Sequence, residues 1–298
     1  MTNGSIRYHA RMQGEKETVK TDNNTCCEGQ GTRLLGSLPE YIYSVAADGV
    51  YVNLFEPSAF RAAVAGKPVG LTLESRFPFR PEVALRLSLP APADLKLRVR
   101  VPSWAVRAMP LSVNGQRVAT GKPGTYATLD RTWADGDTVS FTQPMDFCVT
   151  RYAGLDAIPE HDRYAFEYGP VLLAAVGPLD VKIPVHIKHD PSRPREWLKP
   201  DPDRPLHFSV DGDTRHSFLP YWQVEDQTFT TFPVIEPYNT VQHEASDRYN
   251  ERRTSNAQRP TSKFGVRLRI SRIARKGEGV LQEPPLSKMA VHLTVLKN

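Results

Sequence analysis

The sequence predicts a mainly β protein in which antiparallel β-sandwich structure follows one helical segment. Apolar and polar residues alternate with a period of two in many stretches after residue 50, as half-buried strands require. An Asn-Gly pair at 114–115 separates two short apolar runs and favours a type I′ hairpin turn. Several short strands at this spacing indicate a β-sandwich.

The helical pattern is confined to residues 29–46, GQGTRLLGSLPEYIYSVA. Its apolar residues fall near one face at the 3.6-residue spacing of a helix: Leu34, Leu35, Leu38, Ile42 and Val45. Pro39 is expected to kink or break the helix, because its ring clashes with the preceding turn.

The first β region is expected over residues 48–150. Two stretches alternate most clearly, 83–89 (VALRLSL) and 95–101 (LKLRVRV). In the second stretch the basic residues face away from the apolar side, which is the pattern of a strand with one buried face. Further strands are expected over 50–55, 71–75, 111–118, 138–141 and 164–168.

A second β-rich region is expected over residues 151–237. Prolines are dense from 178 to 237, which indicates long loops, yet large aromatic residues persist there and favour a core. Residues 238–298 lose any apolar pattern, so we expect a basic and poorly ordered tail.

The net charge of +5 is unevenly distributed. Ten Lys and Arg residues lie between Arg248 and Lys276, opposed only by Glu251, so the rest of the chain carries a net charge of −4. A basic segment of this kind binds nucleic acid or a membrane surface in some proteins. Here the segment lacks interleaved aromatic residues, so a solvated tail is the simpler interpretation and no nucleic-acid partner is expected.

No run of eighteen apolar residues occurs, and the first twenty residues lack the apolar core of a signal peptide. A cytoplasmic location is therefore the default expectation, and no membrane partner is expected. Three cysteines in 298 residues also argue against a disulfide-rich secreted scaffold.

Two of those cysteines are adjacent, in the stretch NNTCCEGQGTR at 23–33. Cys26 and Cys27 cannot easily bond to each other, since neighbouring Cα atoms are only ~3.8 Å apart. One interpretation is a pair of small buried apolar side chains. The alternative is half of a thiolate metal site, because Zn²⁺ binds cysteine sulfur and usually takes four ligands. Cys148, in the apolar run MDFCV, is expected to be a core residue.

Several motifs together resemble the β-L-arabinofuranosidase family of glycoside hydrolases, family 127 and its relative 146. The string TCCEGQGTRLLGSLPEYIYS is followed by DGVYVNLFEPS, VPSWA at 101–105, VNG at 113–115 and FEYGPVLLA at 166–174. These pieces occur in the family's order and span residues 7–177. The resemblance implies an (α/α)6 barrel that holds the active site, followed by β-sandwich domains. Residues 1–47 are then expected to be the C-terminal end of the barrel.

The resemblance also implies roles for the cysteine pair. Cys26 matches the catalytic nucleophile, and Cys26 and Cys27 match ligands of a Zn²⁺ ion. The family's remaining zinc ligands and its acid/base glutamate lie upstream of the pair. Only 25 residues precede Cys26 here, including Glu15 and Glu17, so the chain is expected to be the C-terminal part of such an enzyme and inactive alone.

The implied function is retaining, zinc-dependent hydrolysis of non-reducing-end β-L-arabinofuranosyl or similar bonds through a cysteine nucleophile. The implied partner is an arabinose-containing oligosaccharide or glycan. Gly29 and Gly31 are expected to permit close backbone approach at the start of the helix. The alternative function is a non-catalytic β-sandwich module that binds carbohydrate or serves a structural role.

Overall fold

The computed structural model describes residues 11–15, 26–155, 157–178 and 185–237, and for residues 26–28 it describes the backbone alone. All of these belong to the first of two units in the chain, residues 1–239. The expected basic tail at 238–298 lies outside the described residues.

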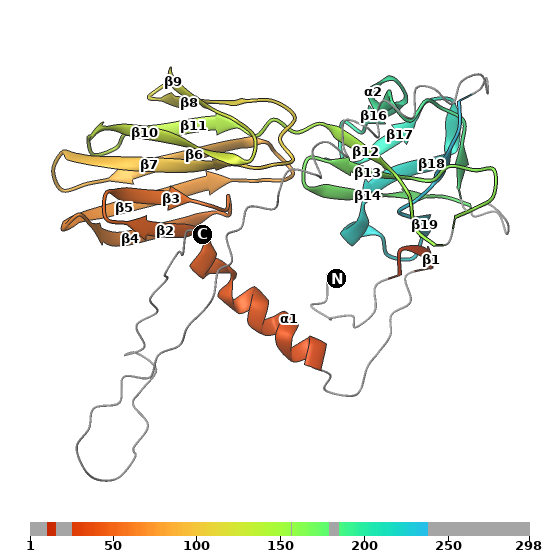
Figure 1. Ribbon diagram of the computed structural model, residues 1–298, viewed down its shortest axis with the longest axis horizontal. Coiled ribbons are helices and arrows are strands. Elements are labelled where there is room, and N and C mark those ends of the chain that lie inside the picture. Colours follow the sequence, from red (N-terminus) through yellow and green to blue (C-terminus); the bar gives the residue numbers. More distant parts are fainter. Residues whose placement is uncertain (1–10, 16–25, 156, 179–184, 238–298) are drawn as a thin grey trace, which may run out of the picture. The chain divides into compact units, whose positions relative to one another are not determined.

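Strands in mostly antiparallel sheets dominate the described chain (Figure 1), which confirms the predicted mainly β fold class. The longest described helix is α1, Cys26–Ser37. No described helix combines the length and apolar character that crossing a membrane requires.

Two facing sheets form the first domain. The smaller sheet has the order β10 (Thr125–Trp133), β7 (Ala93–Val101), β3 (Gly49–Val52) and β2 (Tyr43–Ala46). The larger sheet has the order β4 (Ser58–Val64), β5 (Lys67–Ser75), β6 (Glu82–Ser88), β11 (Thr138–Thr142), β8 (Met109–Val113) and β9 (Gln116–Gly121). Their inner faces share one hydrophobic core.

The core follows the predicted alternation. On β6, Leu85 and Leu87 are at most 1% exposed, and on β7 Leu97 is fully buried. Each such side chain contributes roughly 1.5–3 kcal/mol by leaving water. Trp133 is also fully buried, and its indole N–H donates to the Leu95 carbonyl at 3.0 Å, so its polar atom is satisfied within the core.

One pairing in this sandwich departs from the antiparallel expectation. β3 runs parallel to β7, with Gly49 beside Lys96. A Cβ on Gly49 would lie 1.9 Å from the Lys96 carbonyl oxygen, so only glycine allows the two backbones to approach this closely. The sequence contains that glycine, but alternation alone does not reveal strand direction.

The hairpin between β8 and β9 has the expected turn. Asn114 and Gly115 have φ values of 51° and 82°, the left-handed conformations that a type I′ turn requires at both central residues. Val113 pairs with Gln116 across the turn, so the Asn-Gly pair sets the register next to the turn, and the register then shifts between Leu111 and Ser112.

The helix expected over 29–46 is shorter than predicted. α1 ends at Ser37, a 3-10 helix (Leu38–Tyr41) carries Pro39 near its start, and residues 43–46 form strand β2 rather than helix. Pro39 thus ends the α-helix, as expected. β2 then pairs with β3 through the Ala47-Asp48 turn, and that pairing outweighs the helical spacing of Ile42 and Val45.

A second domain is built on an eight-stranded sheet. Its main path is β1 (Gln13–Glu15), β19 (Thr228–Thr230), β14 (Val171–Val176), β18 (Asp213–Pro220), β17 (Phe208–Val210) and β16 (Leu198–Pro200). Two further strands extend from β14: β13 (Tyr164–Tyr168) and then β12 (Phe147–Arg151). A separate parallel pair consists of β15 (His186–Ile187) and β20 (Val234–Ile235).

Aromatic rings fill the core of the second domain. Phe166 lies edge-on to Phe218 at 5.2 Å between ring centroids and to Trp197 of the short helix α2 (Pro194–Trp197) at 5.6 Å. Edge-to-face geometry of this kind adds about 0.5–1.5 kcal/mol per pair beyond the area buried. The aromatic residues that persist among the prolines therefore form a core.

The N-terminal segment differs from the helical remnant expected over 1–47. Gln13–Glu15 form β1, which pairs with β19 more than two hundred residues later. The Gln13 side chain accepts a hydrogen bond from buried Arg163 at 2.9 Å, and the Met12 carbonyl accepts one from the Thr231 N–H at 2.8 Å. This polar segment forms a strand because its partner supplies the backbone hydrogen bonds, which no local pattern reveals.

Candidate functional site

The cysteine pair opens helix α1. Cys26 and Cys27 are the first two residues of the helix, and α1 leads through the 3-10 helix into β2 of the first sandwich. Their side chains lie outside what the structure describes. The helix therefore joins the predicted nucleophile and zinc ligands directly to the first domain along the chain.

The acidic residues Glu15 and Glu17, which precede the cysteine pair, are described only in part. Glu15 is exposed at the end of β1, where it pairs with Thr228. Glu17 lies outside the described residues. In the part of the chain that the structure covers, no three His, Cys, Asp or Glu side chains are grouped as a metal site.

Cys148 lies apart from the pair in sequence and in structural context. It sits on strand β12, half-buried, in register with Glu167 of β13. The core of the second domain includes its neighbour Val149 but not Cys148, so the expectation of a core residue is not met.

The expectation about the glycines of α1 is not met at Gly29. A Cβ built there would meet no described atom within 4 Å. The helix surface is open on that side, because the described neighbours of α1 do not approach it. Glycine at this position is therefore not required by any described contact.

The apolar residues of α1 are unusually exposed. Leu34 and Leu35 are 59% and 63% exposed, and Leu38 of the following 3-10 helix is 40% exposed. Ile42, by contrast, is 7% exposed and marks where the chain enters the first sandwich. The described residues thus leave the leucine face of α1 uncovered.

Sequence reasoning missed a carboxylate that bridges two imidazoles in the second domain. Glu236, just after β20, accepts hydrogen bonds from His161 Nδ1 and from His186 Nε2, the latter at 2.9 Å. Burial opposes ionisation of Glu236, but the hydrogen bond from His161 and the neighbouring His186 outweigh it and lower the pKa of that carboxyl. These residues lie 25 to 75 positions apart, so no local motif could have found them.

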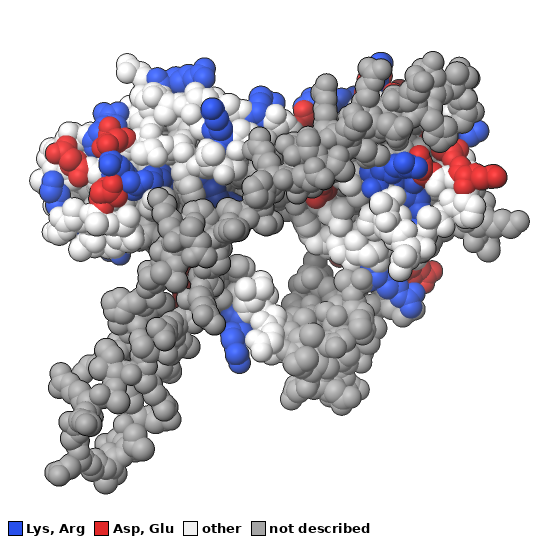
Figure 2. Space-filling view, viewed as in Figure 1, with Lys and Arg blue, Asp and Glu red and all other residues white. Residues whose placement is uncertain are grey.

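A second charged cluster lies at the β2–β3 turn. Asp48 receives two hydrogen bonds from Arg98, at 3.0 and 2.8 Å, and an ion pair from Lys96 at 3.2 Å. The Arg98 hydrogen bonds, followed by that of Lys96, hold the pKa of Asp48 well below its usual range. Acidic and basic side chains likewise lie side by side at the left end of the face shown in Figure 2.

Residues 49–145 match the model of the middle domain of glycoside hydrolase family 127, β-L-arabinofuranosidase. This range covers β3 to β11, which is nearly the whole first sandwich. No curated protein matches the chain significantly.

Three solved structures share the fold. Ara127N-Se, a family 127 β-L-arabinofuranosidase from Geobacillus stearothermophilus T6, is 19% identical to this chain with a TM-score of 0.53. The match covers 72% of this chain and 38% of the Ara127N-Se chain. A second, described as a glycoside hydrolase, is 20% identical, with a TM-score of 0.57 and coverages of 78% and 43%. A third, a family 127 β-arabinofuranosidase, is 22% identical, with a TM-score of 0.54 and coverages of 72% and 39%.

The chain spans about two fifths of the length of these structures. At such identities the likeness establishes a common fold, and the family-model match is independent of it. The two comparisons agree with the motifs of the sequence. Residues 49–145 therefore match the middle domain of glycoside hydrolase family 127, and the described chain shares the fold of solved structures of that family.

Proposed function

We propose that this chain is part of a retaining glycoside hydrolase that cleaves β-L-arabinofuranosyl, or similar furanosyl, bonds at non-reducing ends of a glycan. The observation that carries the proposal is the order of two features along the chain. The cysteine pair opens α1, and the family's middle domain begins at residue 49, shortly after that helix ends.

Cys26 is the proposed nucleophile. Its Sγ forms a bond to the anomeric carbon while the bond from that carbon to the leaving oxygen breaks, and an acid protonates the leaving oxygen. Water then attacks the anomeric carbon, the carbon–sulfur bond breaks, and the conjugate base takes the water's proton. The Cys26 thiolate is regenerated, and the two displacements together retain the configuration.

Zinc is part of this proposal. When bound, the ion supplies positive charge that keeps cysteine thiols deprotonated. Cys26 and Cys27 would hold it, which is half of a tetrahedral ligand set. The described residues do not complete that set, since no further His, Cys, Asp or Glu side chains among them are grouped as a metal site.

The acid/base group is the second component of the proposed catalytic site that the described residues do not supply. A retaining mechanism requires a carboxyl group about 5 Å from the nucleophile across the sugar. Glu15 extends a strand of the second domain, where it is exposed and in register with Thr228. We therefore propose that this chain by itself turns over substrate poorly or not at all, because we assign no described carboxyl group to protonation of the leaving group.

The test uses a substrate that does not need that assistance. In 2,4-dinitrophenyl β-L-arabinofuranoside the leaving group departs as a stable anion, so nucleophilic attack proceeds without an acid. We expect the 298-residue chain, incubated with zinc, to gain the mass of one pentosyl residue at Cys26. The adduct should persist, because we assign no described carboxyl group to the activation of water in the second step.

Intact-mass spectrometry and peptide mapping give the result. Cys26→Ser should abolish the adduct, whereas Cys148→Ser, which removes the cysteine of β12, should leave it unchanged. An adduct that survives Cys26→Ser would reject Cys26 as the nucleophile. Absence of any adduct on the unaltered chain would reject the proposed chemistry for this chain.

A further inference from the structure

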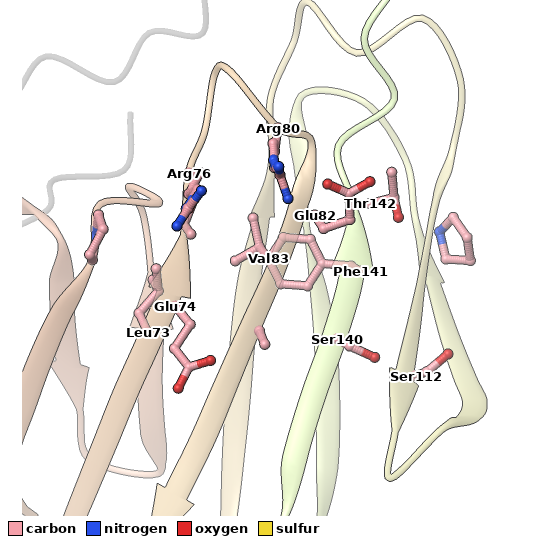
Figure 3. Close-up of a pocket in the computed structure, with 14 residues that line it drawn as sticks. Leu73, Glu74, Arg76, Arg80, Glu82, Val83, Ser112, Ser140, Phe141 and Thr142 are labelled. Atoms are coloured by element: carbon pink, nitrogen blue, oxygen red, sulfur yellow. The ribbon is translucent and has the colours of Figure 1, made fainter. Parts of the chain in front are cut away.

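A groove crosses the outer face of the larger sheet of the first domain, away from the cysteine pair in sequence (Figure 3). Its volume is about 830 Å³, within the range of small-molecule sites. Strands β5, β6, β11 and β8 and the turn between β5 and β6 line it. The core-facing side chains Leu73, Val83 and Phe141 lie beneath, so the groove has a rigid base.

Strand register explains why the surface is hollow there. Glu74 is opposite Ala84, Ala84 is opposite Ser140, and Ser140 is opposite Ser112, so one row crosses four strands. The last three side chains of this row are small. At ~4.8 Å between strands, they open a floor about 10 Å long from β6 to β8. Larger side chains stand at the edges.

Charged side chains of both signs form the rim. Arg76 and Arg80 rise from the β5–β6 turn, while Glu74 and Glu82 rise from the adjoining strands (Figure 3). Among the described residues none of the four belongs to an ion pair or hydrogen bond through its side chain. The rim therefore presents two donors and two acceptors whose charges cancel.

Hydroxyl groups add further hydrogen-bonding capacity. Ser112, Ser140 and Thr142 line the groove, and their hydroxyls make no hydrogen bond with any described residue. A hydroxyl both donates and accepts. The lining is thus dense in unused donors and acceptors, carries no net charge, and has no exposed aromatic ring on its floor.

The turn that carries the arginines is held firmly. The Arg80 N–H donates to the Arg76 carbonyl at 3.1 Å, and between them the ring of Phe77 stacks on Trp104 with centroids 5.8 Å apart. The Phe77 N–H also donates to Ser75 Oγ at 3.0 Å. A turn fixed at its centre lowers the cost of ordering the backbone on binding, while each guanidinium side chain still loses rotamer freedom.

We infer that this groove is a non-catalytic binding site for a neutral, polyhydroxylated ligand, namely a short L-arabinofuranosyl oligosaccharide. The assignment of the ligand as an arabinoside rests on the proposed function, whereas its assignment as a neutral polyol rests on the residues of the groove. A neutral polyol satisfies guanidinium donors and carboxylate acceptors together. An anionic ligand would be repelled by the carboxylates of Glu74 and Glu82, and a cationic ligand would be repelled by the guanidinium groups of Arg76 and Arg80. Bound here, the glycan is held by the sandwich rather than by the catalytic cysteine.

The test measures binding by isothermal titration calorimetry to the full 298-residue chain carrying Cys26→Ser, so that the proposed catalytic cysteine plays no part. Short L-arabinofuranosyl oligosaccharides are the probe. Arg80→Ala should weaken binding about tenfold, since a hydrogen bond to a charged group is worth roughly 1.5–3 kcal/mol. Ala84→Trp should abolish it by filling the floor. Arg86→Ala, on the same face of β6 but outside the groove, should bind like the parent.

Circular dichroism and thermal unfolding verify that each variant retains the sandwich. Absence of binding to the parent would overturn the inference, as would equal binding by the parent and Ala84→Trp. Oligogalacturonate that binds as tightly as the neutral probe would overturn the assignment of a neutral ligand. If the chain binds the oligosaccharide in the groove but forms no adduct at Cys26, the hydrolase proposal alone is rejected. If the adduct forms but the oligosaccharide does not bind, the groove proposal alone is rejected.

Discussion

The two β domains of this chain bury different residues. The first fills its core with aliphatic side chains at alternate strand positions, such as Leu85 and Leu97, with Trp133 as the largest. The second stacks aromatic rings from separated segments, such as Phe166 and Phe218. Among the described residues it also contains most of the buried polar or charged side chains, whereas the first domain has Gln143 alone, just after β11. Those of the second domain are Arg163, His216, Thr230 and Thr231.

The difference shows two ways of organising a β domain. In the first, each strand carries its own apolar face, so neighbouring strands can pair and bury that face without specific polar contacts. In the second, short strands and long loops are joined by specific polar contacts between distant segments. Arg163 shows this most clearly, since it donates to the Phe232 carbonyl at 3.1 Å and to Gln13 at 2.9 Å. Polar contacts of this kind are costly to lose once buried.

The largest expected effect on stability comes from truncating one buried side chain in the core of each domain. Phe218→Ala should destabilise the second domain by about 3–5 kcal/mol, and Leu97→Ala the first by about 2–5 kcal/mol, because each leaves a cavity. Hydrogen-exchange mass spectrometry should show faster exchange confined to residues 147–235 for the first variant and to 43–142 for the second. Faster exchange of both domains in either variant would mean that they unfold as one unit.

An intermediate effect is expected at the bridge formed by Glu236. Glu236→Gln should destabilise the second domain by about 1–3 kcal/mol at neutral pH, because His161 and His186 lose a charged acceptor. The folded state lowers the pKa of Glu236, so its contribution is present above the unfolded pKa of about 4.3 and is lost as pH falls through the folded value.

Urea unfolding at a series of pH values measures this difference. The gap between the parent and Glu236→Gln should be constant near neutrality and should close below about pH 4. Glu225→Gln, at an exposed position in the same domain, is the control and should change little. A gap that widens on acidification would contradict the assigned direction of the pKa change.

The smallest expected effect concerns the β8–β9 turn of the first domain. Gly115→Ala should cost about 1 kcal/mol, because φ is +82° there and an alanine is strained in that conformation. Gly29→Ala in α1 is the matched control: nothing lies within 4 Å of the added Cβ, so stability should be unchanged or slightly raised. Thermal unfolding of the two variants tests the contrast, and equal losses would refute it.

Much of the first domain was predictable because its information is local. The alternation at 83–89 and 95–101 predicted both buried faces, and the Asn-Gly pair predicted the hairpin and its turn type. The helix over 29–46 was predicted too long. Its spacing was helical up to Val45, but residues 43–46 pair with β3, and pairing with a neighbouring strand overrides a weak local pattern.

The candidate site was predicted in part. The motifs around Cys26 led to the resemblance, and the match at residues 49–145 agrees with it for the middle domain, while the roles of Cys26, Cys27 and zinc stay predictions. The groove of the first domain was not predictable as a site. Its floor residues Ala84, Ser112 and Ser140 belong to three strands, and only their register places them in one row.

The mainly β class, the faces of the first sandwich, the Asn-Gly turn and the resemblance to family 127 could all be read from the sequence, because each depends on residues adjacent in the chain. Three features could be known only from the folded chain: β3 runs parallel to β7, Gln13–Glu15 joins the second domain, and Glu236 bridges two histidines. These features depend on hydrogen bonds between segments whose paired residues lie 47 to more than 200 positions apart. Such bonds satisfy backbone and carboxylate groups whose partners no local pattern specifies.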